Sequence, residues 1–141
     1  MSACVLDASF ACQWLFGDEA SPAGDAALRV IAQEGALVPA LWVFEITNVL
    51  GLAARRGRLS VADVQEALEL LRSLPLIVDE PLSLGASDSF LSLMQTHRLT
   101  AYDATYLELA QRHGLALATK DRELLAAASS AGVPLFQVVI P

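Results

Sequence analysis

The fold is indicated by a short apolar stretch near the start of the chain, ACVLD at residues 3–7, which ends on an acid. Four comparable apolar runs follow, at residues 36–38, 76–78, 115–118 and 135–139. Most of these runs lack the alternation of apolar and polar residues that a half-exposed strand shows. We therefore expect about five strands that are covered on both faces.

Helical patterns lie between these runs, and several have recognisable ends. Ser21 and Pro22 supply an N-cap and a first-turn proline, and Ser60 with Asp63 forms a capping box. The predicted helices span residues 22–34, about 40–56, 60–74, 84–97, 100–113 and about 122–130. Strands that alternate with helices predict a parallel sheet with right-handed crossovers. We expect residues 1–141 to form one three-layer α/β/α domain, with helical hairpins that help to form a groove or a dimer surface.

Composition excludes several classes of protein. Apolar residues make up 55% of the 141 residues and charged residues 18%, which excludes a disordered chain. No apolar stretch is long enough for a membrane-spanning helix, and we expect neither such a helix nor a signal peptide. Cys4 and Cys12 are expected to be reduced thiols, which is typical of a cytoplasmic protein. The net charge of −7 argues against a general affinity for nucleic acid.

Four acids follow the apolar runs at the positions where a parallel sheet binds ligands. Asp7 and Asp121 come after the first and fourth runs, Glu45 lies seven residues past Val38, and Asp103 opens a helix. Because the carboxyl ends of parallel strands meet at one edge, these four side chains are candidates for a shared site. The alternative for the aspartates is a helix-capping role. Glu45 is harder to explain in that way, because its neighbours are apolar.

A shared acidic site needs something to hold it together. Two carboxylates ~4 Å apart repel by about 4 kcal/mol at an effective dielectric constant of 20. Either some of them are protonated or a hard cation lies among them. Carboxylate oxygens suit Mg²⁺ or Mn²⁺ better than Zn²⁺. Such a site is typical of metal-assisted hydrolysis of phosphodiesters.

Four motifs in order give the chain a family resemblance. They are VLDAS at residues 5–9, EITNVL at 45–50, YDATYL at 102–107 and ATKDREL at 118–124. Together they resemble the PIN domain, and specifically the VapC-type toxins of bacterial toxin–antitoxin pairs, over essentially the whole chain. By this resemblance the metal ligands and catalytic acids are Asp7, Glu45, Asp103 and Asp121, with Ser9, Asn48 and Thr119 as polar residues that orient them. Gln13 stands where many relatives carry Lys, which removes one cation near the groove.

The resemblance also implies an activity and partners. It implies a Mg²⁺- or Mn²⁺-dependent endoribonuclease that cuts tRNA or ribosomal RNA and leaves a 5′-phosphate and a 3′-hydroxyl. It further implies a homodimer and a VapB-type antitoxin that obstructs the site. The candidate RNA contacts are cations, each of which is equally consistent with a solvated surface charge: Arg55, Arg56, Arg58, Lys120 and Arg122.

Two other classes of function stay open on the sequence alone. A receiver-like or phosphatase-like phosphoryl-transfer domain also carries acids at strand ends and binds Mg²⁺. However, receivers place an acidic pair after the first strand, and the phosphatases need Asp-x-Asp there, whereas this chain has Asp7 followed by Ala8 and Ser9. The second alternative is a PIN-like module that binds a partner without cleaving RNA.

Overall fold

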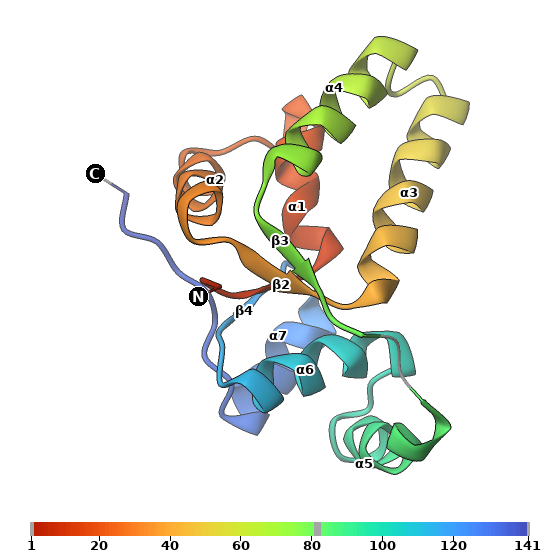
Figure 1. Cartoon of the computed structure of the whole chain (residues 1–141), viewed down its shortest axis with the longest axis vertical. Helices are drawn as coiled ribbons and strands as arrows, with labels where there is room; N and C mark the ends of the chain where they lie inside the picture. Colours follow the sequence, from red (N-terminus) through yellow and green to blue (C-terminus); the bar gives the residue numbers. More distant parts are fainter. Residues whose placement is uncertain (1, 81–82, 141) are drawn as a thin grey trace.

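The computed structural model describes residues 2–80 and 83–140. Among these residues, four short parallel strands form the centre of the molecule, with helices on both faces (Figure 1). Its elements in chain order are β1 (Val5–Leu6), α1 (Ala8–Leu15), the 3₁₀ turn η1 (Gly17–Glu19), α2 (Pro22–Glu34), β2 (Ala36–Val38), α3 (Ala40–Arg55), α4 (Val61–Ser73), β3 (Leu76–Val78), the 3₁₀ turn η2 (Leu84–Ala86), α5 (Ser87–His97), α6 (Ala101–His113), β4 (Leu117–Ala118) and α7 (Arg122–Ala131).

The predicted three-layer α/β/α architecture is confirmed. Helices α1–α4 lie on one side of the sheet and α5–α7 on the other, and α3 and α4 extend from it as a hairpin (Figure 1). The strand order β3-β2-β1-β4 places β1 between β2 and β4. This order creates a switch point between β1 and β4, which is where open α/β sheets bind ligands.

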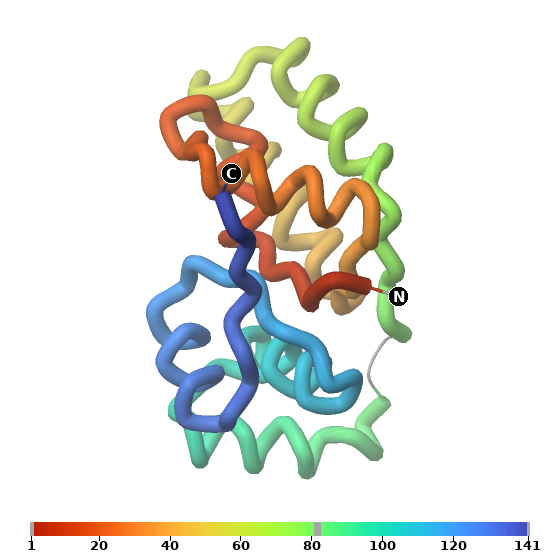
Figure 2. Tube along the Cα trace, turned by 90° about the vertical axis from the view of Figure 1, so that its left-hand side faces the viewer, coloured from red at the N-terminus to blue at the C-terminus, as the bar shows by residue number. Residues whose placement is uncertain are grey.

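The prediction of about five strands is wrong by one. Residues 135–139 form a single parallel bridge, from Leu135 to Leu117, and no strand. β4 is only two residues long and ends before Thr119, so the C-terminal segment pairs with it at a single position. Beyond the bridge, Phe136 packs edge-on against Phe10 of α1, 6.1 Å between ring centroids. The C-terminal segment then runs back past the sheet toward α2 (Figure 2).

Helix ends follow the local signals that the sequence carries. The hydroxyl of Ser21 accepts a hydrogen bond from Gly24 N, and Ser60 and Asp63 form the complete capping box. Thr100 caps α6, which ends at Gly114 in the left-handed conformation. Helix α1 was not predicted. The expectation of strands covered on both faces fails for β3, where Ile77 and Val78 are more than half exposed because β3 is the outer strand.

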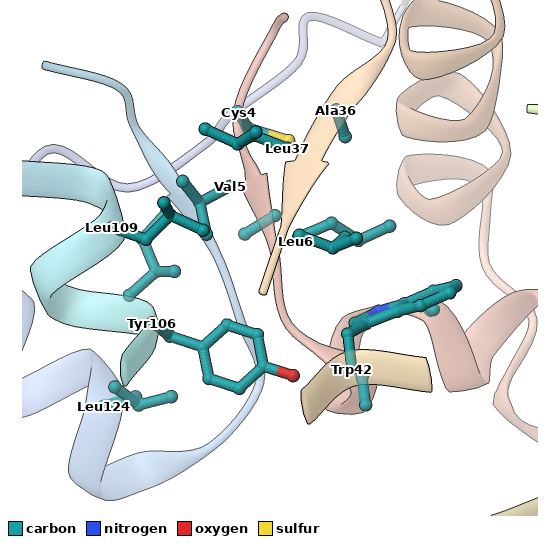
Figure 3. Packing of buried hydrophobic residues seen from close by; sticks show 14 of the residues in the cluster. Cys4, Val5, Leu6, Ala36, Leu37, Trp42, Tyr106, Leu109 and Leu124 are labelled. Carbon is teal, nitrogen blue, oxygen red and sulfur yellow. The ribbon is translucent and has the colours of Figure 1, made fainter. Parts of the chain in front are cut away.

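The core forms around the central strands. Val5 and Leu6 are fully buried, and side chains from α3, α6 and α7 join them in one cluster (Figure 3). The register pairs Leu6 with Ala118. As a result, the residues that follow them, Asp7 and Thr119, leave the sheet side by side. Among the described residues, no helix is both long and apolar enough to span a membrane.

Candidate metal centre

Asp7 is held by hydroxyl groups at the end of β1. Its Oδ2 accepts hydrogen bonds from Ser9 Oγ at 2.6 Å and from Thr119 Oγ1 at 2.7 Å. Ser9 Oγ accepts in turn from the backbone N–H of Lys120, and Thr119 Oγ1 accepts from that of Asp121. Asp7 occupies the N-cap position of α1 but makes no capping bond with its side chain. The capping alternative for Asp7 is therefore wrong.

Glu45 reaches the same region from the first half of α3. Its Oε1 accepts a hydrogen bond from the hydroxyl of Tyr106, a buried residue of α6. Burial raises the pKa of Glu45, and the negative charges of Asp7 and Asp103 raise it further, while the bond from Tyr106 lowers it. The apolar sequence around Glu45 thus has a structural explanation, since the carboxylate finds a buried partner.

Asp103 and Asp121 bring two further carboxylates from α6 and the start of α7. One carboxylate oxygen of Asp103, one of Asp121 and one of Glu123 all lie within 4.8 Å of one another. Burial and the neighbouring acids raise the pKa of Asp103 to about 6. Asp121 also caps α7, because its Oδ1 accepts from Leu124 N at 3.0 Å. For Asp121 the capping alternative is confirmed, and it leaves Oδ2 available to a ligand.

All four predicted acids line one pocket. The pocket has a volume of about 290 Å³, and its wall includes Ser9, Cys12 and Asn48 beside Asp7, Glu45, Asp103 and Asp121. Thr119 is buried behind Asp7, as its bonds show. The prediction that these four acids share a site thus agrees with the pocket lining, and their chemical role is a separate question.

The charge of the pocket lining is negative. Among the residues that the structure describes, none of the nine that line the pocket is Lys, Arg or His. Burial also raises the pKa of Cys12 to about 11, so its thiol is neutral at pH 7. Asp7, like Glu45, has a raised pKa because of burial. An all-oxygen donor set with uncompensated negative charge fits a hard divalent cation such as Mg²⁺ or Mn²⁺.

The predicted RNA-binding cations divide into two groups. Arg56, Arg58 and Lys120 line a hollow of about 490 Å³, which shares Ser9, Cys12 and Val49 with the acidic pocket. Arg55 and Arg122 line neither hollow. Arg122 also forms none of the ion pairs found in residues 2–80 and 83–140, either with Glu123 or with Asp103.

Arg58 already forms ion pairs and an aromatic contact within the protein. Its Nη2 contacts Asp18 at 2.9 Å and Glu19 at 3.2 Å, and its guanidinium lies 3.8 Å from the centroid of the Phe16 ring. These contacts tie the loop after α3 to η1. Two acids already balance the charge of Arg58, so it offers less to a phosphate than Arg56 or Lys120.

Three positions differ from what the sequence suggested. Glu123 joins the acids although the sequence motif at residues 118–124 gave it no role, and its place two residues after Asp121 is the available signal. Tyr106 belongs to the motif at residues 102–107, which gave it no role either, and it lies one turn after Asp103. Gln13 is buried, its Nε2 donates to Phe10 O, and it lines neither the acidic pocket nor the hollow beside it.

Comparison with known proteins gives the same fold and family. A sequence model described as the PIN domain matches residues 4–129. The chain belongs to the PIN-domain family. "Ribonuclease VapC3" of Mycobacterium tuberculosis is 41% identical over 101 residues, which cover 72% of this chain and 71% of that protein. "Exonuclease VapC9" of Pyrobaculum aerophilum is 39% identical over 87 residues, which cover 61% of this chain and 62% of that protein.

A solved structure supports the architecture. The "Toxin-antitoxin complex from Klebsiella pneumoniae" superposes with a TM-score of 0.61 at 18% identity and covers 96% of this PIN domain and 99% of that chain. At this identity the likeness concerns the fold. Membership of the VapC group of PIN domains rests on the sequence relatives and the family match.

Proposed function

We propose that this PIN domain is a metal-dependent endoribonuclease and the toxin of a VapBC-type pair. The observation that carries the proposal is the meeting of Asp7, Glu45, Asp103 and Asp121 in one pocket whose lining has no cation. Relatives named as a ribonuclease and an exonuclease support nuclease activity. The two earlier alternatives from phosphoryl transfer have no comparable support, because the family match is to the PIN domain.

The acids and the polar residues beside them have distinct tasks in this proposal. Asp7, Glu45, Asp103 and Asp121 would hold Mg²⁺ or Mn²⁺, which supplies an activated water and stabilises charge on the phosphate. Ser9 and Thr119 keep one oxygen of Asp7 occupied, so that its carboxylate has a fixed orientation. Asn48 lines the pocket and is exposed, so it is available to substrate or water.

RNA is the substrate that the surroundings favour. The hollow beside the acids carries Arg56 and Lys120, which suit a phosphate backbone that leads to the acidic pocket. Arg55 and Arg122, which lie outside it, have no specific support as RNA contacts. The tRNA or ribosomal RNA class remains our proposed target by family resemblance, and the cytoplasm, where both occur, is the proposed compartment.

The test compares end-labelled linear RNA with a circular RNA of the same sequence. Purified protein with Mg²⁺ should cut both, since only an endonuclease opens a circle. Asp7→Asn and Asp103→Asn should each lower the rate by at least about 100-fold, whereas Asp88→Asn, outside the pocket, should not. Cleavage that persists undiminished in both site variants would rule out the metal mechanism. Loss of all cleavage with retained partner binding would favour the inert module.

An antitoxin partner is supported by the fold likeness to a chain of a toxin–antitoxin complex. A VapB-type antitoxin that obstructs the site would need to cover the acidic pocket and the hollow with Arg56 and Lys120. Expression of this chain alone should arrest the growth of a bacterial host, and co-expression with the product of a neighbouring reading frame should relieve the arrest. Persistence of the arrest in the presence of a bound antitoxin would contradict this part of the proposal.

A homodimer is supported by exposed apolar side chains on α3 and α5. Val43 and Phe44 on α3 are 47% and 73% exposed. Leu91 on α5 is 52% exposed and lines an apolar pocket of about 390 Å³ between α3, α5 and α6. Light scattering should give twice the chain mass of 15.0 kDa for the wild type and the monomer mass for Phe44→Ser. Val61→Ser on α4, equally exposed at 75%, is the control and should remain dimeric.

A further inference from the structure

Tyr106 connects two of the acids through one helix. It lies three residues after Asp103 on α6, so both side chains project from the same face. Its hydroxyl donates to Oε1 of Glu45, which stands 61 residues earlier on α3. Figure 3 shows the Tyr106 ring among the buried hydrophobic side chains, with its hydroxyl directed toward the side where Trp42 of α3 lies. Helix α6 therefore contributes one acid directly and contacts a second.

The position of this hydroxyl is fixed by packing. Tyr106 is 1% exposed and is the largest of the fully buried side chains. Burial, together with the bond to Glu45, raises the pKa of Tyr106 above its usual range, so the hydroxyl keeps its proton and remains a donor. A rigid ring with a permanent donor is a fixed point against which another side chain can be oriented.

Glu45 has little else to orient it. Among residues 2–80 and 83–140, its only side-chain hydrogen bond is the one from Tyr106. A glutamate has three rotatable side-chain bonds, and a free one samples many rotamers. The bond occupies Oε1 and leaves Oε2 for a ligand in the pocket that Glu45 lines with Asp7, Asp103 and Asp121.

We propose that Tyr106 is a positioning residue that orients the Glu45 carboxylate and so sets how tightly the acidic pocket binds a divalent cation. This inference rests on the proposed function. It makes the buried tyrosine part of the metal centre, although it contacts no substrate. Removing the hydroxyl while keeping the ring should leave the core packed and release Glu45.

The experiment measures Mn²⁺ binding by calorimetry, without RNA. Tyr106→Phe should weaken the affinity by about 10-fold, the lower end of what residues that orient metal ligands contribute. Tyr102→Phe is the matched control, because Tyr102 stands on the same helix but is 65% exposed, and its affinity should match the wild type. In a Glu45→Gln background, Tyr106→Phe should have no further effect on affinity.

RNA cleavage supplies a second readout. If Tyr106 acts through the metal, Tyr106→Phe should recover most of the wild-type kcat at saturating Mn²⁺, with the half-saturating Mn²⁺ concentration shifted upward by the same factor. An affinity equal to the wild type, with only a lower Tm, would overturn the role of Tyr106 and leave the proposed function intact. Absence of Mn²⁺ binding to the wild type would overturn both.

Discussion

Thr119 donates a hydrogen bond from Oγ1 to Oδ2 of Asp7 over 2.7 Å, between residues 112 positions apart in the chain. The contact follows from the sheet register, because Leu6 pairs with Ala118 and the next residue of each strand leaves the sheet at the same edge. Thr119 also accepts from the backbone of Asp121. One buried hydroxyl therefore joins the ends of β1 and β4 to the start of α7.

Thr119→Val should weaken Mg²⁺ binding in the acidic pocket while nearly keeping the shape of the side chain. Asp7 loses one donor and the Asp121 N–H loses its acceptor. We expect the Mg²⁺ concentration for half-maximal cleavage to rise about 10-fold or more, and the free energy of unfolding to fall by about 1–3 kcal/mol. Thr47→Val is the control, since Thr47 is exposed and bonds only within its own helix. Equal Mg²⁺ dependence in Thr119→Val and the wild type would contradict this role.

Asp7→Asn should make the metal-free protein more stable. Burial raises the pKa of Asp7, which means that its charge is unfavourable in the fold without a cation. In EDTA, Asp7→Asn should therefore melt a few degrees above the wild type. Metal at 100 times its Kd should stabilise the wild type by about 2.7 kcal/mol and the variant much less. Calorimetric scans with and without Mg²⁺ test this prediction. A Tm of Asp7→Asn in EDTA below that of the wild type would contradict it.

The metal-free protein should lose stability as pH rises toward neutrality. The pKa of Asp103 is about 6 in the fold against an ordinary 3.8, so between these values the folded state binds a proton that the unfolded state has released. The free energy of unfolding therefore falls as pH rises through this window. Asp7 and Glu45 act in the same direction. Solvent screening limits the effect at the half-exposed Asp103.

Thermal melts in EDTA measure this slope. The Tm should fall by a few degrees between about pH 5 and pH 7, and Asp103→Asn should flatten the curve. Asp63 makes no contribution there, because its pKa is lowered by its bonds to Ser60 and its stabilisation is lost only at more acidic pH. A wild-type Tm that rises across the window would contradict the assignment.

Gly35→Ala should be far more costly than the same change at Gly114. Both glycines have positive φ, +80° and +63°. Gly114 is in the left-handed helical region, where alanine costs about 1–2 kcal/mol. Gly35, at ψ 176°, is in a region that essentially only glycine adopts, with strain of about 1–3 kcal/mol. At Gly35 the added Cβ would also lie 2.4 Å from the backbone oxygen of Pro75, whereas at Gly114 it meets open space. Denaturant titration should give a destabilisation for Gly35→Ala at least twice that for Gly114→Ala. Similar losses at the two positions would contradict the close approach of Gly35 to Pro75.

Local signals predicted the helices after α1 well because the causes of their ends are local, whereas α1 has no side-chain cap. The Ser60–Asp63 capping box and the Ser21 cap depend on residues three apart, and both formed. The strand expected at residues 135–139 failed for the opposite reason, since strand pairing depends on a distant partner and β4 is too short to provide one.

The candidate site shows the same division. Topology alone brings strand ends together, which is why the convergence of the four acids could be predicted from their places in the chain. The bond between Tyr106 and Glu45 could not, because it depends on how two helices face each other. Which cations line the hollow could not be predicted from the sequence either. Arg55 and Arg56 are neighbours in the chain, but only Arg56 lines the hollow.

Arg56 and Lys120 should contribute more to RNA affinity than Arg58, although all three line the same hollow. Arg58 is already balanced by Asp18 and Glu19, so its replacement removes little net attraction for phosphate. Binding is best measured in an Asp103→Asn background, which prevents cleavage. There, Arg56→Ala and Lys120→Ala should each weaken binding of a single-stranded RNA.

Salt dependence separates a phosphate contact from a loss of structure. For each phosphate contact removed, the slope of log K against log salt should become shallower by about 0.7. Arg72→Ala, on α4 and away from the hollow, is the control and should leave both affinity and slope unchanged. Arg58→Ala should lower Tm, because it breaks the contacts to η1 and Phe16, and it should leave the salt slope nearly unchanged. An Arg58→Ala slope change as large as that of Arg56→Ala would show that the ion pairs open when RNA binds.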